Sequence, residues 1–194
     1  MPLNLVNNVK LSQPTSNVRH PWLYSSFLFS LYRVMNLPKP NYTNPIHMLA
    51  FGLGSGLSPK APGTTGTLAA LPIYWFFMQD LPVWAYVLVL AITMLVGTYV
   101  CDKTSKDLGV HDHGGIVIDE WLGMWLTMFL APSGIEWLIW GFVLFRIFDI
   151  LKPWPIKWVD AKVGGGFGIM IDDVLAGVAA WLVLQASVYG IALL

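Results

Sequence analysis

A long apolar stretch that carries two adjacent carboxylates limits the folds that this chain can adopt. Residues Ile116–Ala131 are apolar almost throughout, yet Asp119 and Glu120 stand side by side near the start. Carboxylates in so apolar a segment are costly to bury, so something must stabilise them. Two later apolar stretches repeat the pattern: Ile135–Leu151 with Arg146 and Asp149, and Phe167–Leu184 with Asp172 and Asp173. We therefore expect these acids to meet at one site, at one face of a membrane.

Composition supports a membrane protein. Of 194 residues, 56% are hydrophobic and 11% are charged, whereas soluble domains average about 25% charged residues. The mean hydropathy is +0.61. The formal net charge is zero, so no global field would recruit nucleic acid, and no obligatory protein partner is evident. The predicted fold is an all-α, multi-pass helical membrane bundle with its acidic residues clustered at the cytoplasmic end.

Hydropathy and charge placement together predict about five spans. Val83–Val100 contains no charge and is a clean transmembrane candidate. A turn at Pro132-Ser133-Gly134 separates the apolar stretch Ile116–Ala131 from the next one, Ile135–Leu151. We expect these two stretches to form an antiparallel pair of helices. Lysine and arginine fall before Leu68, in Asp102–Gly115, and in or next to Lys152–Gly166, whereas the turns between these regions carry none. This alternation indicates a cytoplasmic N-terminus and an external C-terminus. All the acids named above then lie within about two helical turns of the cytoplasmic interface.

Two regions are predicted along the chain. Residues 1–45 form an N-terminal extension, in which Pro21–Leu37 is either an amphipathic helix in the membrane interface or an ordinary helix packed on the domain. Residues 46–194 form the membrane-embedded domain. Its polar connections are predicted as loops at Phe51–Thr67, Asp102–Gly115 and Lys152–Gly166.

Converging carboxylates repel one another unless a cation or protons compensate. Mg²⁺ is bound by a few carboxylates together with substrate phosphate, and the glycine-rich Phe51–Thr67 segment with Lys60 has the materials of an anion cradle. Alternatives stay open for each group. Taken alone, Phe51–Thr67 is better explained as a plain glycine- and proline-rich loop. Arg146 with Asp149 is equally a structural ion pair. The acid pairs are more simply explained by metal binding than by snorkelling to the interface or by helix N-terminal charge. His111 and His113 are accessory groups at most.

Four motifs in order resemble the bacterial phosphatidylglycerophosphatase A family. They are GSGLSPKAPGTTGTLAALP, GVHDHGGIVIDEWLGMW, FRIFDILKPWPI and GGGFGIMIDDVLAG, and the resemblance runs from about His47 to the last helix. It implies a Mg²⁺-dependent phosphatase of the bacterial inner (cytoplasmic) membrane. Such an enzyme converts phosphatidylglycerol phosphate, a phospholipid substrate in the bilayer, to phosphatidylglycerol and phosphate, the last step of that lipid's synthesis.

With this resemblance we assign roles to the polar residues. We expect Glu120, Asp149, Asp172 and Asp173 to supply the Mg²⁺ ligands, directly or through water, and Asp119 to act as a base or further ligand. The predicted phosphate-binding residues are Lys60, Thr64, Thr65, Arg146 and Lys152. Attack by activated water and a phosphoaspartyl intermediate both remain open. The alternative functions are a phosphatase of another lipid phosphomonoester, such as phosphatidic acid, and a small ion-coupled transporter.

Overall fold

Helices account for all the regular structure in residues 39–110 and 113–193, which are the residues that the computed structural model describes. In chain order they are α2 Pro45–Ala50, the 3₁₀-helix η1 Gly52–Leu57, α3 Pro62–Ile73, the π-helical turn η2 Tyr74–Met78, α4 Val83–Leu108, α5 Ile118–Thr127, α6 Ile135–Leu151, α7 Ile156–Lys162 and α8 Gly165–Ala192. The predicted all-α class is thus confirmed for this part of the chain. The predicted helix Pro21–Leu37, with most of the extension, and His111 lie outside the described residues.

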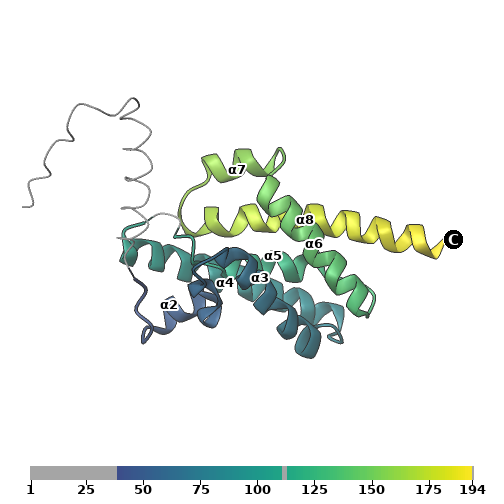
Figure 1. Ribbon diagram of the computed structural model, residues 1–194, viewed down its shortest axis with the longest axis horizontal. Helices are drawn as coiled ribbons and strands as arrows, with labels where there is room; N and C mark the ends of the chain where they lie inside the picture. Colours follow the sequence, from purple (N-terminus) through teal and green to yellow (C-terminus); the bar gives the residue numbers. More distant parts are fainter. Residues whose placement is uncertain (1–38, 111–112, 194) are drawn as a thin grey trace, which may run out of the picture. The chain divides into compact units, whose positions relative to one another are not determined.

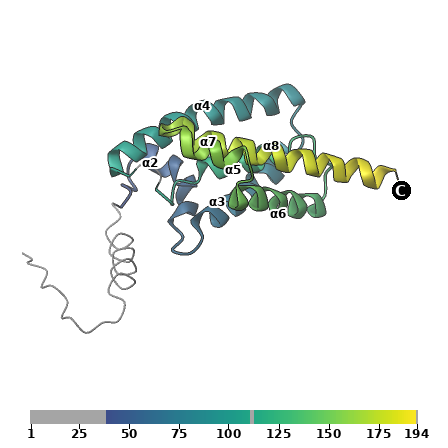
Figure 2. The ribbon, with the colours of Figure 1, turned by 90° about the horizontal axis from the view of Figure 1, so that it is seen from above.

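The last helix, α8, contacts four of the other described helices. It packs against α4, α5, α6 and α7, and Figure 1 shows it as the long helix that ends at the C-terminus. Figure 2 shows α4 and α6 on opposite sides of it. Its buried positions include Ala176, Gly177 and Ala180, and small residues let neighbouring helices come close. The helical spacing of these three residues in the sequence favours this packing, and the structure confirms it.

Helices α5 and α8 approach each other through two glycines. A Cβ added at Gly177 would lie 2.6 Å from the carbonyl oxygen of Gly123, and one added at Gly123 would lie 2.8 Å from the carbonyl oxygen of Asp173. Both distances are shorter than real Cβ atoms tolerate, so neither position accepts a side chain without a shift. This backbone-to-backbone contact brings the start of α5 beside the acids of α8.

Helix α5 is shorter than predicted, because it ends at Thr127 while the predicted segment extends to Ala131. The last carbonyls of a helix have no partner within it and need donors from elsewhere. Tyr86 donates its hydroxyl to the carbonyl of Trp125, in the last turn, at 2.6 Å. Just beyond the end of α5, Trp181 donates its indole N–H to the carbonyl of Phe129 at 2.8 Å. Gln185 donates to the same Phe129 carbonyl at 3.0 Å. These side chains allow a helix to end within an apolar bundle.

The structure corrects the three predicted loops. Helix α4 continues to Leu108, so the first half of the predicted loop Asp102–Gly115 is helical. Helix α7 occupies the middle of the predicted loop Lys152–Gly166. Within Phe51–Thr67, η1 and the first residues of α3 are helical. In each case the glycine, proline or charged residues predicted an interruption of helical structure. The residues between these positions nevertheless form helical turns.

Among the residues that the structure describes, two helices are long and apolar enough to cross a membrane, α4 and α8. Helix α4 exposes a row of large apolar side chains, among which Leu95 is 73% and Trp84 71% exposed. Such a continuous apolar surface is typical of a face that contacts membrane or another protein. The chain therefore has the features of a membrane-associated helical protein, and the number of spans stays a prediction.

Candidate functional site

Three helices bring the acidic residues together. Asp119 and Glu120 lie in the first turn of α5, and Asp149 lies near the end of α6. Asp172 and Asp173 lie in the second and third turns of α8 and are only 6% and 3% exposed. Helix α6 thus returns toward the end of the domain where α5 begins, as the predicted antiparallel pair requires.

These residues line a polar cavity of about 310 Å³. Of the described residues, six with carboxyl groups and two with cationic groups line it: Asp119, Glu120, Asp149, Asp160, Asp172, Asp173, Arg146 and Lys152. With every group ionised, six negative and two positive charges leave a formal charge of −4. A site with this excess needs cations or protons to be stable.

In the described part of the chain, Asp119, Glu120 and Asp173 form a compact group of carboxylates. One oxygen from each lies within 4.8 Å of the others, which is close enough for a single cation to contact all three. Oε2 of Glu120 is buried and has no hydrogen-bond partner among the described residues. A buried charged oxygen without a partner is costly, and the donor set of hard oxygens suits Mg²⁺. The residues present therefore fit a divalent cation. Asp149 and Asp172, which the sequence analysis also predicts to be ligands, lie outside this compact group.

Arg146 lies at the wall of the cavity and is held from two sides. Its Nη1 donates to Oδ2 of Asp149 at 2.5 Å and to Oγ1 of Thr67 at 3.4 Å. Thr67 is fully buried in α3 and donates its own hydroxyl to the carbonyl of Gly63 at 2.9 Å. A Cβ added at Gly63 would clash with Glu120 and crowd Arg146. The start of α3 therefore packs directly on the site.

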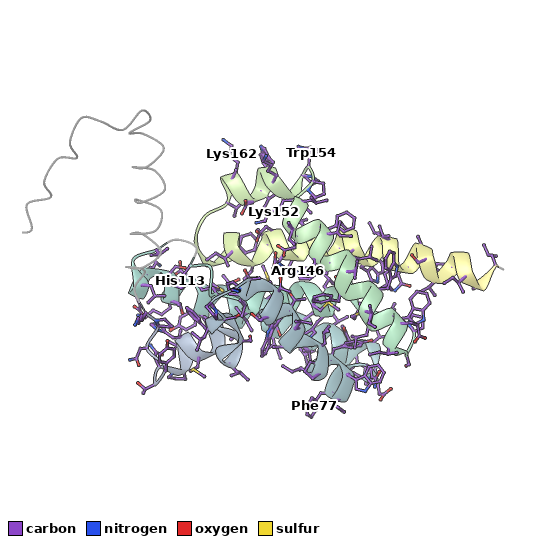
Figure 3. The ribbon with its side chains drawn as sticks, in the orientation of Figure 1. Phe77, His113, Arg146, Lys152, Trp154 and Lys162 are labelled. Carbon is purple, nitrogen blue, oxygen red and sulfur yellow. The ribbon has the colours of Figure 1, made fainter. Side chains whose placement is uncertain are left out.

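Lys152 is the second cation, and it stands at the end of α6 (Figure 3). Its Nζ donates to Oδ2 of Asp172 at 2.5 Å and to Oδ1 of Asp160 at 3.0 Å. Partial burial opposes the charge, but the hydrogen bonds and charges of these two carboxylates outweigh burial and raise the pKa of Lys152. Lys152 is therefore cationic at neutral pH. Its backbone adopts a left-handed conformation, φ 41°, that ends α6.

Three predicted phosphate ligands lie outside the lining of this cavity. Lys60 is exposed, and the hydroxyl of Thr65 donates to the carbonyl of Pro62 at 2.8 Å. Thr64 is partly buried near the start of α3.

His113, the predicted accessory group, accepts a hydrogen bond from the backbone N–H of Gly115 at 3.1 Å and lies against the ring of Phe51. Among the predicted phosphate-binding residues, the structure thus brings Arg146 and Lys152 to the acids.

Sequence reasoning missed three residues at the site: Asp160, Thr67 and Gly63. Asp160 lies within a stretch that the sequence predicts to be a basic loop, so no pattern singled it out. It lies on α7 and pairs with Lys152, eight residues before it in the chain. Thr67 belongs to a run of similar hydroxyl residues, and no local signal separates it from Thr64 and Thr65. The proline at the first position of α3 is a usual helix start and could have indicated that Gly63 and Thr67 are helical.

Comparison with known proteins gives a consistent result. Residues 48–188 match the sequence model of a family described as "Phosphatidylglycerophosphatase A". A protein of that name from Escherichia coli (strain K12) is 55% identical over 137 residues, which cover 70% of this chain and 79% of the relative. Another from Haemophilus influenzae is 47% identical over 154 residues, covering 79% of this chain and 94% of the relative.

A more distant relative carries a different name. A protein of Bacteroides thetaiotaomicron, provisionally named a phosphatidylinositol-3-phosphatase, is 33% identical over 147 residues, covering 72% of this chain and 91% of the relative. No solved structure matches the chain. The family match and the two relatives of the same name decide the assignment: the chain is an enzyme of the phosphatase class and belongs to the phosphatidylglycerophosphatase A family.

Proposed function

We propose that this protein hydrolyses the phosphomonoester of phosphatidylglycerol phosphate in a Mg²⁺-dependent reaction, giving phosphatidylglycerol and inorganic phosphate. The observation that carries the proposal is the cavity in which a compact carboxylate group adjoins two cationic side chains. Phosphate esters need both kinds of group, because cations stabilise the charge on the transferring phosphoryl group and oxygen ligands hold a metal beside it.

Asp119, Glu120 and Asp173 are the residues we propose to hold the cation, with Asp149 and Asp172 as further ligands, directly or through water. A bound Mg²⁺ would polarise the phosphate and lower the pKa of water. The single observation that favours this set is the spacing of its oxygens, all within 4.8 Å. Asp119 also has the position of a general base, because it belongs to the compact group and lines the cavity.

Arg146 and Lys152 are the residues we propose to bind the phosphate. Both are donors only, and a guanidinium can contact two phosphate oxygens at once. Each is paired with carboxylates, Arg146 with Asp149 and Lys152 with Asp160 and Asp172. These pairs hold the two cations pointing into the cavity in advance, so that orienting them costs little when substrate binds. Contact of Lys60, Thr64 and Thr65 with phosphate stays a prediction.

The reaction is proposed to take place at the cytoplasmic face of the bacterial inner membrane. The exposed apolar surface of α4 and the length of α8 support insertion, and the distribution of lysine and arginine supports a cytoplasmic site. A phosphate headgroup at this interface could enter the cavity while the acyl chains stay in the bilayer. Family membership removes the reason for the transporter alternative.

A different phosphomonoester lipid is the second candidate substrate, because the Bacteroides relative is named for an inositol lipid. Detergent-purified protein should be assayed for phosphate release from phosphatidylglycerol phosphate, phosphatidic acid and phosphatidylinositol 3-phosphate at equal surface concentration. We expect the highest kcat/KM for phosphatidylglycerol phosphate. A higher kcat/KM for either of the other two lipids would show that this lipid is the substrate, and the proposed phosphatase reaction would still stand.

A further inference from the structure

A shallow apolar groove of about 350 Å³ runs along α6 and meets the polar cavity. Its lining residues are Phe142, Val143, Arg146, Ile147, Ile150 and Leu151. Two of them, Arg146 and Ile150, also line the polar cavity. We propose that this groove holds an acyl chain of the lipid substrate while the phosphate occupies the cavity. The inference rests on the proposed function and adds that the enzyme selects diacyl substrates by their chains.

The groove has an exposed apolar lining with a single cation at its junction with the cavity. Ile147 is 44% and Leu151 70% exposed, so the lining is accessible from outside the bundle. Arg146 is the charged member, and its guanidinium is fixed by Asp149 and Thr67. An occupant with an anionic head and an apolar tail matches this order of groups, and a phospholipid monoester has that chemistry.

The length of the groove also fits one acyl chain. From Phe142 to Leu151 a helix rises by about 14 Å, at about 1.5 Å per residue. This is close to half of the roughly 30 Å hydrocarbon core of a bilayer, which is the depth of one leaflet. A chain lying along α6 from its C-terminal end would therefore remain within its own leaflet.

The groove should orient the substrate more than it increases total affinity. An acyl chain that leaves the bilayer for the groove exchanges one apolar surrounding for another, so the hydrophobic gain is small. A chain held beside Arg146, however, restricts the position of its headgroup, and correct positioning of a reacting group contributes strongly to rate. We therefore expect the groove to affect kcat/KM for diacyl substrates and to leave substrates without chains unaffected.

The test compares two tryptophan variants on two substrates. Ile147→Trp places a bulky ring in the groove, whereas Leu88→Trp does the same on α4, where Leu88 is 50% exposed and lines none of the cavities above. Phosphate release is measured from long-chain phosphatidylglycerol phosphate and from the same headgroup without acyl chains. We expect Ile147→Trp to lose about tenfold in kcat/KM on the diacyl lipid only, and Leu88→Trp to match the wild type on both.

Two outcomes would overturn the groove proposal while leaving the proposed function intact: equal losses on both substrates in Ile147→Trp, or no loss on either. Failure of the wild type to release phosphate from either substrate would instead contradict the proposed function, and the groove proposal with it. A second measurement does not depend on turnover. Phosphatidylglycerol phosphate with a photoreactive group in its acyl chain should crosslink to residues 142–151, and Ile147→Trp should reduce that labelling. Labelling elsewhere only would contradict the proposal.

Discussion

Lys152 lines the cavity and also connects neighbouring helices. Its left-handed backbone ends α6, and its ammonium group joins Asp160 on α7 to Asp172 on α8. Non-glycine residues adopt this conformation at a cost, and such strain is concentrated at functional sites. Lys152 therefore occupies the point where the end of α6 meets both neighbouring helices.

Replacing Lys152 by glutamine should lower kcat/KM for phosphatidylglycerol phosphate by about 100-fold, because a preorganised donor to the phosphate is worth 10²–10³ in rate. Lys157→Gln is the matched control, since Lys157 is exposed on the neighbouring α7 and lies outside the cavity lining. Steady-state phosphate release measures both variants. Equal losses in the two would show that positive charge in this region in general, rather than the contacts of Lys152, supports activity.

Glu120 is a residue that we expect to cost stability when no cation is present. Glu120→Gln removes one of three converging carboxyl groups, so the metal-free protein should melt about 2–4 °C higher at an alkaline pH at which all three are ionised. Mg²⁺ should raise the Tm of the wild type, because a ligand that binds only the folded state stabilises it, and it should raise that of Glu120→Gln less.

Glu136→Gln is the control for this comparison, because Glu136 is exposed at the start of α6. Its thermal unfolding in detergent should follow the wild type with and without Mg²⁺. An identical response of Glu120→Gln and the wild type to Mg²⁺ would argue against Glu120 as a ligand.

At the scale of helices, the site depends on how closely α5 and α8 approach. Part of this contact could be predicted, because Ala176, Gly177 and Ala180 follow the acids of α8 at helical spacing. The role of its partner Gly123 could not be predicted, since a glycine within an apolar helix does not indicate which neighbouring helix it contacts. Helix α7 was missed for a related reason: Pro153, Pro155 and the glycines after it resemble a loop, and only packing on α8 shows that the turn between them is helical.

Gly177→Ala tests the approach of the two helices. The new Cβ would lie 2.6 Å from the Gly123 carbonyl, so we expect a destabilisation of about 1–3 kcal/mol and a loss of activity as the acids separate. Gly190→Ala is the control on the same helix, because a Cβ there meets nothing within 4 Å and alanine favours helix by up to about 1 kcal/mol. Thermal unfolding in detergent and phosphate release distinguish them. A Gly177→Ala protein as stable and active as Gly190→Ala would rule out this contact as a determinant of the site.

At the scale of the whole molecule, hydropathy predicted the class of fold, and the acids within apolar stretches predicted which residues surround the cavity. The sequence could not show which oxygens lie closest, because adjacent residues on a helix point about 100° apart. Asp119 joins the compact group and Asp149 pairs with Arg146 as a result of how α5, α6 and α8 are rotated about their axes. Such rotations depend on packing between helices that are distant in sequence.

The reaction that we propose for this cavity is the hydrolysis of a lipid phosphomonoester with the help of a divalent cation. It is tested most directly by inorganic phosphate release from phosphatidylglycerol phosphate by the detergent-purified full chain, with Mg²⁺, with chelator, and with Mg²⁺ restored. We predict release with Mg²⁺, loss of release with chelator and recovery after Mg²⁺ is added back. Release that continues undiminished in chelator would contradict the metal's role, and no release from folded protein would contradict the proposed reaction.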